Sequence, residues 1–202
     1  MKKIYLLTII SLLIISCEKE SGPTKINGSV KDKTTNAGIE NAEVGLFETD
    51  GESAFGLGGV LIDEIYSDAD GKFTFDFEAR KGYSYYVQAI KDQFWNNQTD
   101  NITFVENTGG ETDVTVFLQP EGWLSIRLHN INVYNPTDYI SVSDIGLFYG
   151  NAIDTTVVQI IYGNQENRIV WGIVIDGIPP EVNEFIYIYC PAFDTTFYEI
   201  LY

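Results

Sequence analysis

The chain has 202 residues, of which 45% are hydrophobic and 14% aromatic, and its formal net charge is -17. A polypeptide of this length can build one or two hydrophobic cores. A surface this acidic repels nucleic acid and anionic lipid. Its charge therefore argues against both as direct binding partners.

The N-terminus has the pattern of an export signal. A basic stretch at residues 1–3 precedes an apolar stretch at residues 4–15, which is too short to span a bilayer as a stable helix. The sequence Ile-Ile-Ser-Cys at residues 14–17 resembles the bacterial lipobox. This resemblance implies that residues 1–16 are a lipoprotein signal peptide and that Cys17 carries a diacylglycerol. We therefore expect an outer-membrane lipoprotein, facing the periplasm or exposed on the cell surface, whose partner is the membrane through this anchor.

Residues 17–23 lack apolar periodicity, and we interpret them as a lipidated tether. The acidic residues that follow Cys17 resemble the surface-export signals of Bacteroidota lipoproteins. Lipidation occupies the Cys17 thiol, so Cys190 is expected to be the one free cysteine and no internal disulfide can form. Cys190 lies in an apolar, strand-like run, which predicts a buried, inert thiol.

Short β-rich runs separated by Gly, Asn, Asp and Pro follow the tether, and this pattern is typical of an all-β sandwich. Phe73, Phe75 and Phe77 alternate with polar residues, so all three should face one core. Seven strands are expected in the first half, near Lys25–Lys31, Ala42–Glu48, Leu61–Ser67, Lys72–Glu78, Tyr83–Lys91, Asn101–Glu106 and Asp113–Leu118.

Several motifs of the first half occur in the order found in one known family. Ile26–Asp32 matches its opening G-x-V-x-D strand, Ile39–Leu46 its x-A-x-V-x-L strand, and Ser67–Phe75 its T-D-x-x-G-x-F-x-F hairpin. Residues 24–119 thus resemble the carboxypeptidase regulatory-like, or transthyretin-like, β-sandwich, which is Ig-like. The resemblance implies a seven-stranded, accessory, non-catalytic domain. His129 is the one histidine of the chain, so the histidines of a peptidase zinc site are missing.

A second small β-sandwich domain is predicted for residues 120–202. Pro120 and Gly122 interrupt strand formation at the boundary. Six further strands are expected, at Trp123–His129, Tyr139–Tyr149, Thr155–Tyr162, Arg168–Asp176, Glu184–Cys190 and Thr195–Leu201.

Two loops carry aromatic residues beside amide or acidic side chains, the combination with which sugar-binding proteins stack on pyranose rings and bond their hydroxyls. The alternative is that these aromatics fold back onto the core. The candidate ligand-binding residues are Trp95, Asn96 and Asn97 in the first loop, and Tyr134 and Tyr139 in the second.

Two further kinds of site are suggested by short patterns. Asp68 and Asp70 could bind Ca²⁺, although a plain hairpin turn explains them as well. No other cofactor is expected. Asp-Thr-Thr occurs twice and would place O-linked glycans on Thr155 and Thr195 if they are exposed.

Together these features predict a lipid-anchored, non-enzymatic cell-envelope protein with a binding or assembly role. Glycan capture and docking to an outer-membrane protein complex are the two forms considered. The alternatives are a structural or adhesive surface subunit that assembles through β-strand edges, and an enzyme of unknown type.

Overall fold

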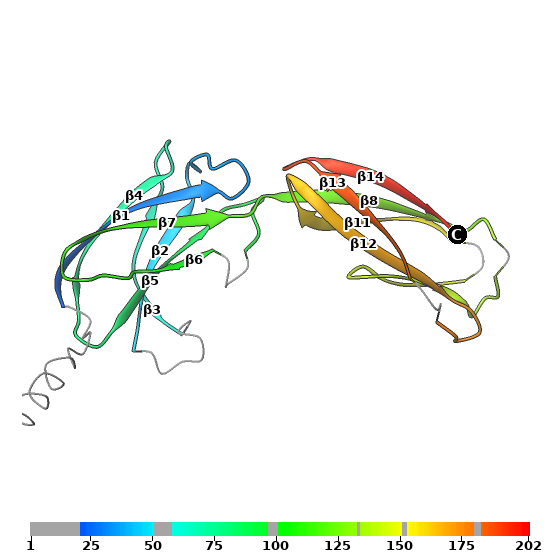
Figure 1. Cartoon of the computed structure of the whole chain (residues 1–202), viewed down its shortest axis with the longest axis horizontal. Helices are drawn as coiled ribbons and strands as arrows, with labels where there is room; N and C mark the ends of the chain where they lie inside the picture. Colours follow the sequence, from blue (N-terminus) through cyan, green and yellow to red (C-terminus); the bar gives the residue numbers. More distant parts are fainter. Residues whose placement is uncertain (1–20, 51–57, 97–100, 133, 151–152, 180–182) are drawn as a thin grey trace, which may run out of the picture. The chain divides into compact units, whose positions relative to one another are not determined.

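The computed structural model describes residues 21–50, 58–96, 101–132, 134–150, 153–179 and 183–202, and within them it is all-β (Figure 1). Cys17, the predicted lipidation residue, and the candidate Asn97 lie outside the described residues. No helix of the described part is long and apolar enough to cross a membrane. The strands divide into four small sheets, two in each half of the chain.

The first half contains the seven expected strands. They are β1 (Gly22–Asp32), β2 (Glu43–Thr49), β3 (Val60–Tyr66), β4 (Lys72–Ala79), β5 (Ser84–Ile90), β6 (Ile102–Phe104) and β7 (Glu111–Leu118). One sheet has the order β4-β1-β7 and the other β3-β2-β5-β6. Strand β1 begins three residues earlier than expected because Gly22 and Pro23 pair with Ala79 and Glu78 of β4.

The alternation of inward-facing and outward-facing residues along the strands explains the core of the first half. Phe73 and Phe75 of β4 are 5% and 1% exposed, and Phe77 is half-buried, as the sequence predicts. Val114, Val116 and Leu118 line the inner face of β7 in the same way. Thr74 and Asp76 between the phenylalanines of β4 are exposed, so this periodicity of two fixes which face of the strand is buried.

A buried carboxylate also connects strands of the first half. Glu48 of β2 is 8% exposed. Arg80 bonds it through Nε, at 2.8 Å, and through a second guanidinium nitrogen, while the Tyr85 hydroxyl donates to its Oε1 at 2.6 Å. The Arg80 hydrogen bond is the main reason that the pKa of Glu48 is lowered. Burial raises the pKa of Tyr85, so this hydroxyl remains a donor.

This network predicts an acid-sensitive contribution to stability. A carboxyl whose pKa is lowered by folding stabilises the native state above its unfolded pKa, and this contribution is lost as the pH falls through the folded pKa. We expect Glu48→Gln to lower the urea midpoint of unfolding at pH 7. The difference in midpoint between the variant and the wild type should become smaller as the pH falls from about 5 to about 3. Urea titrations across this range measure it, and a gap that widens toward low pH would contradict the assignment.

The second half holds seven strands where six were expected. They are β8 (Glu121–His129), β9 (Tyr139–Val142), β10 (Gly146–Tyr149), β11 (Asp154–Tyr162), β12 (Gln165–Val174), β13 (Glu184–Cys190) and β14 (Thr195–Leu201). The expectation of one strand over Tyr139–Tyr149 is wrong. The chain turns after Val142, whose carbonyl accepts from the Ile145 amide at 3.1 Å, and Asp144 has a φ of 62°.

The two sheets of the second half have the orders β11-β8-β14 and β10-β9-β12-β13. Strand β14 runs parallel to β8, and the other pairs are antiparallel. The core between these sheets contains Leu124, Ile126, Leu128, Ile140, Val142, Ile161, Ile169, Ile188, Cys190, Ile200 and Tyr202. Cys190 is fully buried and unpaired, and burial raises its pKa, which confirms the predicted buried thiol.

The chain folds into two compact units, each with its own core, because most contacts between residues lie within one unit or the other. The second unit comprises residues 117–202 together with residues 31–37 and 90–96, so the Trp95 loop belongs to this unit although it follows β5 in sequence. This grouping places Trp95 among the side chains of the second sandwich.

Candidate ligand-binding site

A groove of about 380 Å³ lies beside the β11–β12 hairpin of the second unit, and it includes the predicted residue Trp95. We call it the Trp95 groove. Its lining comes from the Trp95 loop, the β9–β10 turn, the end of β11 and the start of β12. The lining residues are Trp95, Ser143, Asp144, Ile145, Gln159, Ile160, Ile161, Tyr162, Gln165, Glu166, Asn167, Arg168 and Ile169.

Three contacts hold Trp95 at this groove. Its backbone amide donates to the Gln119 carbonyl at 2.9 Å, and its indole Nε1 donates to the Ile161 carbonyl at 3.2 Å. Its ring packs against Tyr162 with a centroid separation of 4.8 Å and an interplanar angle of 47°. Trp95 therefore lies half-buried against the second sandwich in one defined position.

The hairpin that forms one wall is fixed by an amide side chain. Asn167 accepts from the Tyr162 amide at 3.2 Å, and its Nδ2 donates to the Tyr162 carbonyl at 2.9 Å. Asn164, with a φ of 56°, occupies the turn and donates from its backbone amide to the Cys190 carbonyl. This bonding fixes the backbone that carries the Tyr162 ring, so the aromatic pair is preorganised.

The other polar groups of the groove suit a neutral, hydroxyl-rich ligand. Gln159 and Gln165 present amides that both donate and accept hydrogen bonds. Asp144 and Glu166 add acceptors, and Arg168 adds a cation, whose guanidinium carbon also lies 4.8 Å from the centre of the Phe185 ring. A few polar groups around apolar and aromatic side chains are the usual composition of a small-molecule site.

The other predicted ligand-binding residues do not all reach this groove. Asn96 is exposed and adjoins Trp95 in sequence. Tyr134 stacks on Tyr202, and Tyr139 packs on Tyr149 with centroids 4.7 Å apart. Tyr139 pairs with Val174 at the far end of β12, about 17 Å along that strand from Ile169, the last β12 residue of the groove lining, at about 3.3 Å per residue. The structure thus separates the two candidate loops.

The predicted calcium residues form a hairpin turn. The Asp68 carboxylate accepts from the backbone amides of Asp70 and Lys72, at 2.9 and 2.8 Å, and the Asp70 side chain is exposed. Among the residues that the structure describes, no group of three or more His, Cys, Asp and Glu could hold a metal ion. Calcium binding at Asp68 and Asp70 stays a prediction.

The predicted glycosylation residues lie on strands rather than loops. Thr155 is the second residue of β11 and is half-buried opposite Leu128. Thr195 begins β14 and is exposed, with its amide bonded to the Asp194 carboxylate at 2.7 Å. Exposure therefore favours Thr195 over Thr155 as an acceptor.

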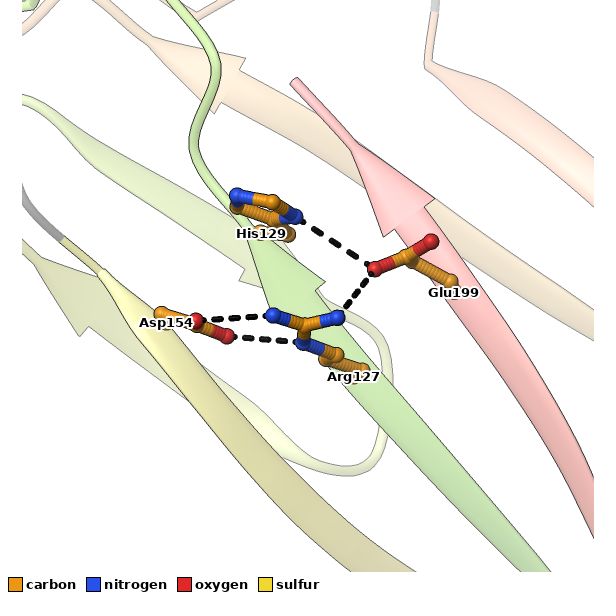
Figure 2. A network of polar contacts seen from close by, with 4 residues as sticks. All are labelled: Arg127, His129, Asp154 and Glu199. Carbon is orange, nitrogen blue, oxygen red and sulfur yellow. Dashed lines mark hydrogen bonds and ion pairs between the residues drawn. The ribbon is translucent and has the colours of Figure 1, made fainter.

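An ion-pair network crosses the outer face of the β11-β8-β14 sheet (Figure 2). Arg127 makes two 2.8 Å hydrogen bonds to Asp154 and one of 3.0 Å to Glu199, which lies 3.4 Å from His129 Nδ1. The Arg127 bond lowers the pKa of Asp154. All three strands contribute, but the network contains no hydroxyl or thiol nucleophile. Its side chains are partly to largely exposed, so these cross-strand pairs contribute little to stability.

Sequence reasoning missed most of the groove. It assigned Tyr162 to a strand end, and neither Gln159 nor Gln165 stood out.

The sequence also suggested one apolar run over Phe185–Cys190, whereas Phe185, Tyr187 and Tyr189 are each more than half exposed. Their alternation with Ile186, Ile188 and Cys190 was the signal that could have revealed this outward face.

The comparisons with known proteins give matches among solved structures only. No protein-family model matches the chain, and a search of curated proteins finds no match. Among solved structures, a minor pilin of Streptococcus agalactiae is 11% identical, with a TM-score of 0.42 over 90% of this chain and 95% of the pilin. A streptococcal ancillary pilin is 13% identical, with a TM-score of 0.40 over 89% of this chain and 62% of its own.

The Bacillus anthracis TIE protein is 11% identical, with a TM-score of 0.39 over 89% of this chain. The chain spans only about a third of that protein's length, since the match covers 34% of it. The Ig-like β-sandwich character of both units rests on the strand order described above. The resemblance to the carboxypeptidase regulatory-like family stays a prediction from the sequence.

Proposed function

We propose that this protein captures neutral glycans at the cell envelope without cleaving them, and that the Trp95 groove is the binding site. The observation that carries the proposal is the pairing of Trp95 and Tyr162 at one wall of a groove that also contains Gln159 and Gln165. Aromatic rings pack against the apolar face of a sugar, and amides bond its hydroxyl groups.

Charge favours a neutral ligand over an acidic one. The chain carries a formal net charge of -17, and Asp144 and Glu166 lie in the groove itself. Arg168 is the one cationic residue of the groove lining, so an anionic saccharide would meet more negative than positive charge there. Neutral hexose polymers avoid this repulsion.

The predicted anchor gives this activity a location. A diacylglycerol on Cys17 would hold the sandwiches at the membrane surface, because the acidic chain has no electrostatic attraction to anionic lipid. Mass spectrometry of the protein purified from membranes tests the anchor separately from sugar binding.

The full chain, purified in detergent, should be applied to an array of neutral and acidic glycans. We expect binding to a subset of neutral glycans and recovery of each bound glycan at its original mass. Silence across the array, or binding confined to acidic glycans, would overturn the proposal. Recovery of a shortened glycan would show an enzyme instead of a capture protein.

A further inference from the structure

Strand β3 is the edge of its sheet and is unusually accessible. In the order β3-β2-β5-β6 it pairs antiparallel with β2, and among the described residues no strand pairs with its other side (Figure 1). All seven of its residues are exposed, including Val60 at 70% and Tyr66 at 58%. The outward backbone N–H and C=O groups of such a strand are available to another extended chain.

This edge has few of the features that normally block strand addition. Val60–Tyr66 contains no proline and no lysine, and five of its residues are apolar. The pairing register with β2 shifts between Leu46 and Phe47, so Ile62 is an extra, unpaired residue of β3 that bends this strand locally. One amide, that of Glu64, is occupied by the Asp63 carboxylate at 2.9 Å.

That last contact also places negative charge at the edge. Because Asp63 bonds the next backbone amide, its carboxylate is held close to the strand backbone. Glu64 follows on the opposite face of the strand, so both faces of an added strand would meet an acidic side chain. A second copy of this chain is a poor occupant, since an antiparallel pair centred on β3 would set Asp63 opposite Asp63.

We infer that β3 takes up an extended segment of a different protein, one with basic residues at its centre and β-branched or aromatic residues on both sides. Backbone hydrogen bonds would supply affinity, and the Asp63–Glu64 pair would select the partner by charge. This inference names a partner class for strand-edge assembly. It concerns the first unit and does not depend on the Trp95 groove.

The test uses the full chain and two twelve-residue peptides that differ only at their centre. Both alternate valine and threonine on each flank, and the central pair is two lysines in one peptide and two glutamates in the other. Isothermal titration should show the lysine peptide binding at least tenfold more tightly. The variant with both Asp63→Lys and Glu64→Lys should reverse this preference, which a merely unfolded variant could not do. Ile62→Pro should weaken both peptides, since its ring obstructs the edge.

Three results would overturn the inference. The first is equal affinity for the two peptides, the second is no binding of either, and the third is an unreversed preference in the double variant. Sedimentation that showed a dimer lost on Ile62→Pro would identify a second copy as the occupant instead. Because glycan binding by the same samples is measured separately, failure at β3 is distinguishable from failure at the groove.

Discussion

Ile126→Ala should lower the free energy of unfolding of the second unit by about 2–5 kcal/mol. Ile126 is fully buried on β8, which lies between β11 and β14 and is the central strand of its sheet. Truncation would leave a cavity among Leu124, Leu128 and Ile200, which belong to the same core cluster. Urea unfolding followed by tryptophan fluorescence measures the loss, because Trp123 lies on the same strand.

Arg127→Ala provides the matched control. Arg127 follows Ile126 directly but projects to the solvent face, where it bonds Asp154 and Glu199 (Figure 2). Its side chain is 47% exposed, so solvent and salt screen these pairs. The loss should be several-fold smaller than for Ile126→Ala and should vanish at high salt. Equal losses from the two neighbours would show that the alternation along β8 is wrongly assigned.

Trp95→Ala should weaken neutral-glycan binding by about 30-fold or more, the effect of removing an aromatic anchor worth about 2 kcal/mol. The substitution removes the ring that packs on Tyr162 and the indole hydrogen bond to the Ile161 carbonyl. Isothermal titration with the best glycan from the array measures the change. Trp95→Phe, which keeps a ring but loses the indole donor, should give an intermediate affinity.

Tyr139→Ala is the control for that experiment. Tyr139 was an equal candidate in the sequence, but it pairs with Val174 and packs on Tyr149 away from the groove. Its removal should leave the dissociation constant within about twofold of wild type, which is close to the precision of such a measurement. A larger effect at Tyr139 than at Trp95 would move the site to the other end of the second unit.

The sandwiches were largely predictable because their information is local. Alternation over Lys72–Phe77 fixes both the strand and its buried face, and the β4 burial pattern confirms it. The turn at Asp144 was missed because Val142 and Ile145 flank it, so Ser143 and Asp144 resemble polar positions within one strand. Its left-handed residue is an aspartate, which tolerates that conformation without a glycine signal.

The groove was predictable only in part because its residues meet through tertiary structure. Trp95 stood out as an aromatic residue in a polar loop, but its bonding partner Ile161 lies 66 positions later. The Glu48–Arg80–Tyr85 network is hidden for the same reason, since Tyr85 and Glu48 are 37 positions apart. Without that pairing in space, neither Glu48 nor Gln159 differs from other polar residues along a strand.

Nuclear magnetic resonance of the indole N–H groups tests the central claim most directly. The chain has three tryptophans, Trp95, Trp123 and Trp171, and each gives one indole signal that single substitutions can assign. On titration with a bound neutral glycan, the Trp95 signal should show the largest saturable shift, larger than that of Trp123, whose cross-strand partner Ile160 lines the groove, and larger than that of Trp171. A saturable shift of Trp123 or Trp171 with Trp95 unchanged would contradict the groove as the binding site.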